Sequence, residues 1–133
     1  MINKEELMQE ALKARESSYS PYSKFAVGAA LLTKSGIIYH GTNIENASYP
    51  LTICAERAAV FSAYSNGVKK NDIEAIAIVA DTVDACSPCG ACRQVLYELL
   101  PSDAKIYLGN LKGVIKEVNT EYLLPFAFDP SDL

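Results

Sequence analysis

The sequence has little that would mark an exported or a membrane-bound protein. No apolar run is long enough to cross a bilayer. The N-terminus, residues 1–6, lacks the apolar core region (h-region) of a signal peptide. The four cysteines are therefore expected to stay reduced and to be available to a metal rather than to disulfides. We expect a cytoplasmic protein with no membrane partner.

Positive charge is also scarce. Lys and Arg number 12 against 16 Asp and Glu, which gives a net charge of −4 and a pI of about 5.0. Proteins that bind nucleic acid normally carry a basic patch, because phosphate contacts supply much of their affinity. The composition therefore argues against a nucleic-acid partner.

Internal repeats, linkers and low-complexity segments are missing as well. A chain of 133 residues, of which 50% are hydrophobic and 21% charged, can bury a substantial core and is too apolar for wholesale disorder. We expect residues 1–133 to form a single domain.

What the sequence does contain is an alternation of helical and strand patterns. Helices are expected over residues 4–17, 52–64 and 89–100, with a helical turn near 121–124. Strands are expected over residues 25–32, 37–39, 73–80, 105–108 and 114–118. Asn3 can cap the first helix, and Gly28 marks a bulge or a close backbone approach. This order predicts an α/β fold, a three-layer α/β/α sandwich around a mixed five-stranded sheet.

The strongest chemical signal lies in two short motifs, residues 54–56 and residues 87–92. At the start of a helix, Cys89 and Cys92 stand at positions i and i+3, so both sulfurs face one ion, and Pro88 suits the first turn. Cys54 supplies a third thiolate from elsewhere in the fold. Three protein ligands leave one tetrahedral position of a zinc ion open for water, and Glu56 is placed to take the proton of that water.

Other uses of these cysteines remain open. A Cys-x-x-Cys pair also occurs in structural zinc sites and in redox pairs. Cys86 could complete a closed four-sulfur site, or begin an iron–sulfur stretch that lacks its usual Cys-Pro ending. The open site is favoured because Glu56 follows Cys54 at a fixed offset and a proline precedes the Cys-x-x-Cys pair. This is the pattern of zinc deaminases, with cysteine in place of histidine as the first ligand.

The charge of such a site predicts a role for two arginines. Three thiolates outweigh the charge of Zn²⁺, and an ionised Glu56 adds a further negative charge, so the metal would acidify its water poorly. Helix N-termini directed at the sulfurs offset part of this charge. Arg57 and Arg93 could do the same by donating hydrogen bonds to ligand sulfurs. Either arginine could instead be a surface salt-bridge partner.

Four motifs, taken in order, make the chain resemble a small homotetrameric cytidine deaminase over nearly its whole length. They are Phe-Ala-Val-Gly-Ala-Ala at 25–30, Asn-Ile-Glu-Asn at 43–46, Cys-Ala-Glu-Arg at 54–57 and Pro-Cys-Gly-Ala-Cys-Arg-Gln at 88–94. The resemblance implies hydrolytic deamination of cytidine and 2′-deoxycytidine to uridine and 2′-deoxyuridine with release of ammonia, a reaction of pyrimidine salvage. Its substrate would be a small-molecule nucleoside.

The resemblance also implies the catalytic groups. Cys54, Cys89 and Cys92 match the ligands of one Zn²⁺ per chain, and Glu56 matches the proton shuttle. Cys86 matches no residue with a known role.

Contacts with the substrate are implied in the same way. Asn43 and Glu45 match residues that hydrogen-bond the ribose hydroxyls. Phe25 matches an aromatic residue that packs on the base, and Ala55 matches a residue whose backbone contacts the pyrimidine edge.

Two further aromatic residues are expected to act between subunits. Tyr49 and Phe126 match residues that reach the active site of a neighbouring subunit in a homotetramer. The tail around Phe126 is also aromatic and apolar, where chain ends are commonly polar. Docking of this tail on the core of its own chain is the alternative.

Three other functions remain as alternatives. A deaminase of the blasticidin-S type shares the cysteine motifs, but the Asn-Ile-Glu-Asn stretch favours a plain nucleoside. A polynucleotide deaminase fits poorly with the acidic pI. A non-enzymatic zinc or iron–sulfur module is the third. A phosphorylated substrate is disfavoured, because residues 41–53 contain no Lys or Arg and both arginines near the cysteines are expected to contact sulfur.

Overall fold

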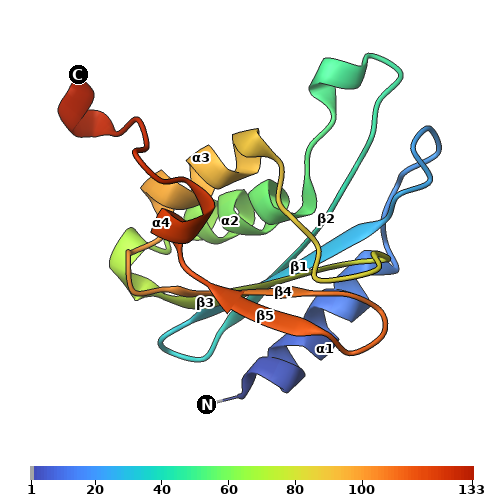
Figure 1. The fold of residues 1–133 in the computed structure, drawn as a ribbon, viewed down its shortest axis with the longest axis horizontal. Coiled ribbons are helices and arrows are strands. Elements are labelled where there is room, and N and C mark those ends of the chain that lie inside the picture. The colour runs from blue at the N-terminus through green and yellow to red at the C-terminus, as the bar shows by residue number, and fades with distance from the viewer. Residues whose placement is uncertain (1) are drawn as a thin grey trace.

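Helices and strands follow one another in the order expected from the sequence. The computed structural model describes residues 2–133, and Figure 1 shows its elements. The helices are α1 (Lys4–Arg15), α2 (Ala55–Ser65), α3 (Gly90–Leu99) and α4 (Thr120–Leu123). The strands are β1 (Val27–Thr33), β2 (Ile38–Thr42), β3 (Ile73–Ala80), β4 (Lys105–Gly109) and β5 (Ile115–Val118). Short 3₁₀ helices lie at Tyr49–Leu51, Lys70–Asp72 and Pro130–Asp132.

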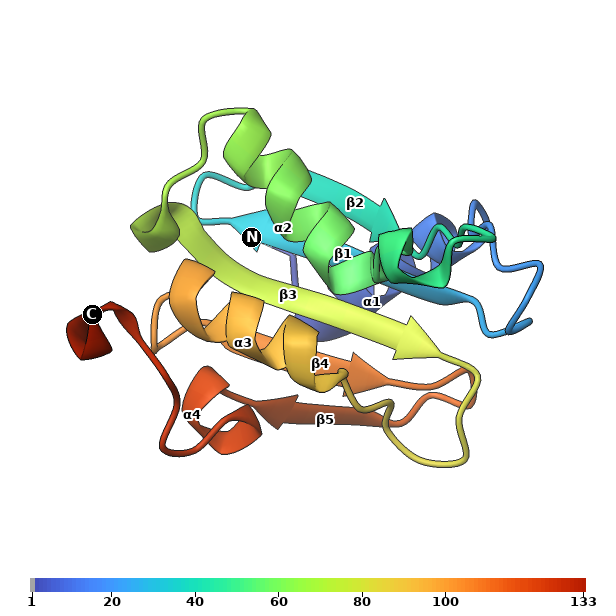
Figure 2. The same ribbon diagram turned by 90° about the horizontal axis from the view of Figure 1, so that it is seen from above.

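The strands form one five-stranded sheet in the order β2-β1-β3-β4-β5. β3 and β4 run parallel, whereas the other neighbouring pairs run antiparallel. A parallel pair needs a crossover connection, and α3 supplies it over one face of the sheet, as Figure 2 shows. The mixed five-stranded sheet expected from the sequence is therefore confirmed.

Two separate hydrophobic cores pack on the two faces of the sheet. α1 buries Leu7 and Met8 against one face, whereas α2 and α3 bury Val60 and Leu96 against the other (Figure 1). Residues 75–80 of β3 alternate between the two cores, because successive strand side chains point to opposite faces. This double burial explains why β3 is a near-continuous apolar run. The three-layer α/β/α arrangement is confirmed.

Two glycines let helices lie close to the sheet. A Cβ atom on Gly28 would lie 2.0 Å from the carbonyl oxygen of Ala11, so α1 can lie on β1 only because residue 28 has no side chain. Gly41 has the same relation to α2, since a Cβ atom there would lie 2.4 Å from the carbonyl oxygen of Ala55. The close approach expected at Gly28 is confirmed, and Gly41 allows the first turn of α2 to lie close to β2.

α2 and α3 begin slightly later than the sequence predicted. Ile44 and Ile53 exchange backbone hydrogen bonds of 3.1 and 3.0 Å, so the chain is still extended where the helix was expected to begin. Cys54 consequently becomes the N-cap residue of α2. At α3 the extended Cys89 is the N-cap, so Pro88 precedes the helix, and the prediction that it lies in the first turn was wrong.

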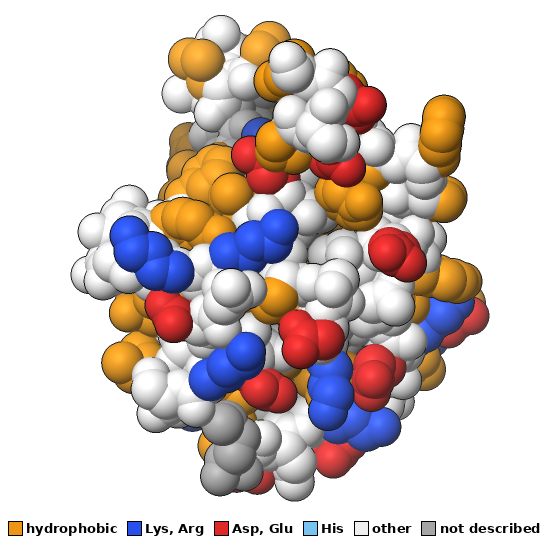
Figure 3. Space-filling model, turned by 90° about the vertical axis from the view of Figure 1, so that its left-hand side faces the viewer, with side chains coloured by type: hydrophobic (Ala, Val, Ile, Leu, Met, Phe, Trp, Pro, Cys, Tyr) orange, Lys and Arg blue, Asp and Glu red, His pale blue; other side chains and the backbone are white. Residues whose placement is uncertain are grey.

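The face of the molecule that Figure 3 shows is mixed in charge. On the face that Figure 3 shows, Lys and Arg side chains are interspersed with Asp and Glu rather than gathered in one basic stripe. Within residues 2–133, no helix has the length and apolar character needed to traverse a bilayer. The segment after α4 leads away from the sheet and ends in the turn at Pro130–Asp132 (Figure 1).

Candidate active site

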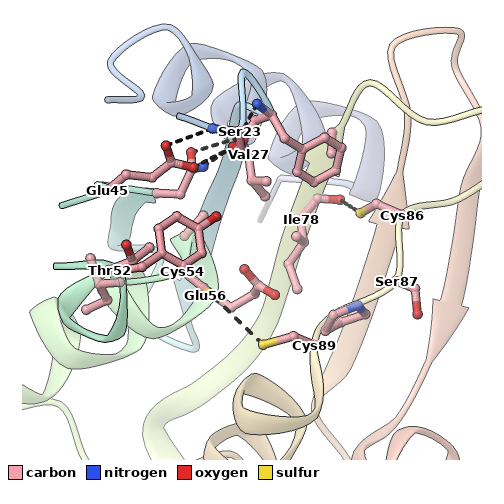
Figure 4. A pocket seen from close by; sticks show the side chains of 17 residues that line it. Ser23, Val27, Glu45, Thr52, Cys54, Glu56, Ile78, Cys86, Ser87 and Cys89 are labelled. Atoms are coloured by element: carbon pink, nitrogen blue, oxygen red, sulfur yellow. Dashed lines mark hydrogen bonds between the residues drawn. The ribbon is translucent and has the colours of Figure 1, made fainter. Parts of the chain in front are cut away.

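The predicted metal ligands lie where α2 and α3 begin. Cys54 and Cys89 are the N-cap residues of these helices, and Cys92 lies in the first turn of α3. The three sulfur atoms lie within 4.8 Å of one another, and the sulfurs of Cys54 and Cys89 are 3.8 Å apart (Figure 4). Cys92 is buried, Cys54 half-buried and Cys89 exposed. The three residues are therefore positioned to coordinate one metal ion.

The electrostatics of this cysteine cluster suit a bound cation. The Cys92 thiol and the Arg57 guanidinium lower the pKa of Cys54 to about 5, against the opposing effect of burial. Arg57 donates a hydrogen bond to the Cys54 sulfur at 3.3 Å, as expected from the sequence. The Nε of Arg57 is buried and has no hydrogen-bond partner within residues 2–133. Three soft sulfur ligands, of which Cys54 has a lowered pKa, fit zinc.

Cys86 does not join the cysteine cluster. Its thiol donates a hydrogen bond to the backbone carbonyl of Ile78 at 3.3 Å (Figure 4). Burial raises the pKa of Cys86 to about 11, so it remains a thiol at neutral pH. The sulfur of Cys86 is not part of the group formed by Cys54, Cys89 and Cys92. The structure therefore supports the open site with three sulfurs rather than the closed site with four.

Glu56 lies beside the cluster as the second residue of α2 (Figure 4). Its side chain is only 4% exposed. Burial raises the pKa of the Glu56 carboxyl group. A raised pKa makes it easier for the carboxyl group to take up a proton, which suits a proton shuttle.

A pocket of about 250 Å³ lies next to Cys54 and Cys89. Its walls come from segments that are far apart in the sequence: the loop before β1, the segment after β2, the start of α2, the end of β3 and the segment before α3. All of the residues expected to contact a substrate line it, namely Phe25, Asn43, Glu45 and Ala55. The structure thus brings the predicted substrate contacts and the predicted catalytic groups into one cavity.

Asn43 is buried and its amide is held by hydrogen bonds. The amide oxygen accepts a hydrogen bond from the Val27 N–H at 3.0 Å and another from the Ser18 hydroxyl. The amide nitrogen donates to the carbonyl oxygen of Phe25 at 2.7 Å. Asn43 therefore holds the chain at Phe25, just before β1, and at Val27, the first residue of β1. One amide N–H of Asn43 remains for a ligand.

Glu45 is held by residues that the sequence did not single out. Its carboxylate accepts hydrogen bonds from the N–H groups of Tyr22 and Ser23, at 2.9 and 3.1 Å, and from the Ser23 hydroxyl. Ser23 also lines the pocket. In the sequence, residues 20–23 were evident only as a break after the first helix. Nothing local marks Ser23 as a partner of Glu45, because the two residues are 22 positions apart.

Comparisons with known proteins agree with this geometry. The sequence model of the family described as "Cytidine and deoxycytidylate deaminase zinc-binding region" matches residues 1–109. The chain is 56% identical over 132 residues to a cytidine deaminase of Halalkalibacterium halodurans, a match that covers 99% of this chain and 98% of the relative. The chain belongs to the cytidine deaminase family.

Further relatives of the cytidine deaminase family extend the comparison. A cytidine deaminase of Sporosarcina psychrophila is 55% identical over 129 residues, which covers 97% of this chain and 93% of the relative. The crystal structure of a cytidine deaminase from Burkholderia pseudomallei has a TM-score of 0.93 and 46% identity, over 96% of this chain and 100% of the other. The resemblance seen in the four motifs is therefore confirmed, together with the fold and the zinc-binding character of the family.

Arg93 of the cytidine deaminase motif at 88–94 does not contact sulfur, and that prediction was wrong. Its Nε donates to the carbonyl of Pro88 at 2.8 Å, its Nη1 to the carbonyl of Leu123 at 2.9 Å and its Nη2 to the Ser87 hydroxyl at 2.6 Å. The guanidinium therefore joins the segment before Cys89 to the end of α4. Among residues 2–133, Arg93 forms no salt bridge and no hydrogen bond to a cysteine sulfur.

The two aromatic residues expected to act between cytidine deaminase subunits lie at different places. Tyr49 lines the pocket of its own chain and is about half exposed. Phe126 projects fully into solvent from the tail, which is tethered to α3 by a 2.9 Å hydrogen bond from Gln94 to the carbonyl of Phe128. The aromatic ring of Phe126 does not dock on its own core. Its action in a neighbouring subunit stays a prediction.

The open three-sulfur site predicts opposite effects for two cysteine substitutions. Cys86→Ala should leave one zinc ion per chain, because the Cys86 sulfur lies outside the cluster. Cys89→Ala should lose the zinc ion, because two remaining thiolates hold zinc weakly. Elemental analysis of the purified variants, scaled to protein concentration, measures both. Loss of zinc from Cys86→Ala would show that the site has four sulfur ligands.

Proposed function

We propose that the chain catalyses the hydrolytic deamination of cytidine and 2′-deoxycytidine, forming uridine and 2′-deoxyuridine with release of ammonia. The observation that supports this best is the buried Glu56 beside the cysteine cluster, in a pocket that also contains Asn43 and Glu45. The relatives from Halalkalibacterium halodurans and Burkholderia pseudomallei are named cytidine deaminases. A chain with this activity would serve pyrimidine salvage.

Each protein group in the site has a part in the proposed reaction. A zinc ion held by Cys54, Cys89 and Cys92 supplies a Lewis acid that makes a water molecule nucleophilic. Glu56 takes one proton of the water as its oxygen attacks C4 of the base, and passes this proton to N3. It then takes the second proton from the same oxygen and passes it to the amino nitrogen, so that the C4–N bond breaks, ammonia leaves and the C4 carbonyl of the product forms. Arg57 offsets part of the negative charge of the Cys54 thiolate through its hydrogen bond to the sulfur.

The proposed substrate contacts follow the lining of the pocket. Glu45, kept ionised by the hydrogen bonds that lower its pKa, can accept a hydrogen bond from a ribose hydroxyl. Asn43 has one amide N–H to donate to the same sugar. The half-exposed ring of Phe25 offers an apolar surface to the base. The backbone of Ala55, next to Glu56, offers a contact for the pyrimidine edge.

The charges of the pocket favour a nucleoside over a nucleotide. The pocket lining contains the acids Glu45 and Glu56 and, within residues 2–133, no Lys or Arg. A doubly charged phosphate would therefore meet repulsion and no partner. The N-termini of α2 and α3, which could bind a phosphate, are occupied by the cysteine cluster.

We propose that the chain acts as a homotetramer in the cytoplasm. The exposed Phe126 and the partly exposed Tyr49 suit packing between subunits, because large aromatic side chains on a surface commonly mark protein interfaces. Thiolates that bind zinc persist where thiols are kept reduced, as in the cytoplasm.

Glu56→Gln separates catalysis from metal binding. Zinc content and thermal stability should stay near those of the wild type, because Glu56 is not a metal ligand. Turnover of cytidine should fall at least about 10²- to 10⁴-fold, the usual contribution of a general acid–base group. The loss of cytidine absorbance measures turnover, and elemental analysis serves as the control on the same sample. Full turnover in this variant would refute the assigned shuttle.

Four compounds test the proposed substrate class. Cytidine and 2′-deoxycytidine should be good substrates, whereas cytidine monophosphate should be poor because the pocket repels phosphate. Cytosine should also be poor, because sugar contacts help to position C4 and their loss lowers turnover as well as binding. Steady-state kinetics on the four compounds decide this, with Glu45→Ala as the comparison variant. The nucleoside assignment fails if the monophosphate reacts as well as cytidine, or if Glu45→Ala leaves cytidine kinetics unchanged.

Light scattering coupled to size exclusion tests the assembly. The wild type should have four times the mass of one chain, and Phe126→Ala should show reduced activity because the aromatic ring is expected to pack at a neighbour's active site. Tyr122→Ala, which removes another exposed aromatic residue, is the matched control. A fully active monomer would rule out the homotetramer.

A further inference from the structure

The carboxylate of Glu45 is held by a single short loop that precedes β1. One carboxylate oxygen accepts hydrogen bonds from the Tyr22 and Ser23 N–H groups, at 2.9 and 3.1 Å. The other oxygen accepts a hydrogen bond from the Ser23 hydroxyl (Figure 4). Ser23 therefore contacts both oxygens of Glu45 and fixes the plane of the carboxylate.

The same hydroxyl also reaches Phe25. The Phe25 N–H donates a hydrogen bond to the Ser23 oxygen at 3.0 Å, so one side chain stands between the two residues proposed to contact the sugar and the base. The backbone between Ser23 and Phe25 is strained, because Lys24 has a φ of 60°. A non-glycine residue is strained in this left-handed region of φ and persists there only where other contacts hold it. The hydrogen bonds between Ser23 and Glu45 are contacts that hold Lys24 in this conformation.

The number of acceptor sites on Glu45 limits what it can bind. An ionised carboxylate offers about four lone-pair sites, and three of them are used by Tyr22 and Ser23. About one acceptor site is left for a ligand, and its direction is set by the three bonds already made. The Ser23 hydroxyl and the two N–H groups also lower the pKa of Glu45, which keeps it an acceptor.

We infer that Ser23 is a positioning residue, which aims the remaining acceptor site of Glu45 at a sugar hydroxyl and so sets the preference of the pocket for a hydroxylated sugar. This inference rests on the proposed function, since it assigns a role to Ser23 in binding the nucleoside. It also predicts that Ser23 matters only for ligands that carry the hydroxyl. A serine that merely stabilised the loop would affect all ligands alike.

The decisive test compares Ser23→Ala with the wild type on cytidine and on 2′,3′-dideoxycytidine. On cytidine, kcat/KM should fall about tenfold, mainly through KM, the usual effect of losing one hydrogen bond to a charged group. On the dideoxy compound, which has no ribose hydroxyl at C2′ or C3′, the change should be less than about twofold. Ser23→Thr keeps the hydroxyl and should restore most of the loss. An equal fall on both compounds would overturn the inference.

Two further variants control the experiment. Ser17→Ala removes an exposed serine that lies before the loop and outside the pocket lining, and it should leave both compounds unchanged. In a Glu45→Ala background, Ser23→Ala should have little further effect on cytidine, because its partner is already absent. Additive losses in the double variant would show that Ser23 acts independently of Glu45 and would contradict the inference.

Binding measurements separate this inference from the proposed function. Titration calorimetry with uridine and 2′,3′-dideoxyuridine requires no turnover, and Ser23→Ala should weaken only uridine binding. If the wild type binds uridine in this way but does not deaminate cytidine, the proposed reaction fails and the role of Ser23 stands. If the wild type deaminates cytidine but Ser23→Ala weakens the binding of both compounds alike, the proposed reaction stands and the role of Ser23 fails.

Discussion

The site depends on the meeting of two helix N-termini at one point of the fold. α2 and α3 each begin at a cysteine, and their approach places three sulfurs within 4.8 Å of one another. α2 reaches this point because Gly41 leaves room for it against β2. α3 reaches it because the parallel pairing of β3 and β4 requires a crossover that starts beyond the end of β3. The unpaired N–H groups of two first turns then lie next to the sulfurs and favour their thiolate form.

The other end of the pocket depends on hydrogen bonds between segments that are distant in the sequence. Asn43 and Glu45 follow β2, and both are held by groups from residues 18–27. A substrate would therefore meet side chains that are already fixed, and binding would not have to order them. The rigid part of the pocket thus includes a loop, although loops are usually the mobile parts of a fold.

The features predicted from the sequence depend mostly on neighbours in the chain, whereas those missed depend on distant partners. The bounds of β3 were predicted correctly because an apolar run buried on both faces is a strong local pattern. Asn3 caps α1 through its own capping box with Glu6. The start of α2 was missed because Ile53 pairs with Ile44 instead of entering the helix. The hydrogen bond from Arg93 to Leu123 could not be predicted, since Leu123 lies 30 residues away.

The positive charge at the cysteine cluster is smaller than the sequence predicted. With Arg93 bonded to carbonyls, Arg57 is the arginine that contacts a ligand sulfur. Three thiolates and an ionised Glu56 carry four negative charges, of which a divalent cation offsets two, and one guanidinium and two helix N-termini offset most of the rest. Burial first, and the Cys54 thiolate second, raise the pKa of Glu56 and suit it to carry a proton. In the pocket lining, Glu45 and Glu56 stand without any Lys or Arg among the described residues, which disfavours a phosphate. Under the proposed function, the acidic side chains of the pocket would serve both proton transfer at Glu56 and the selection of an uncharged nucleoside.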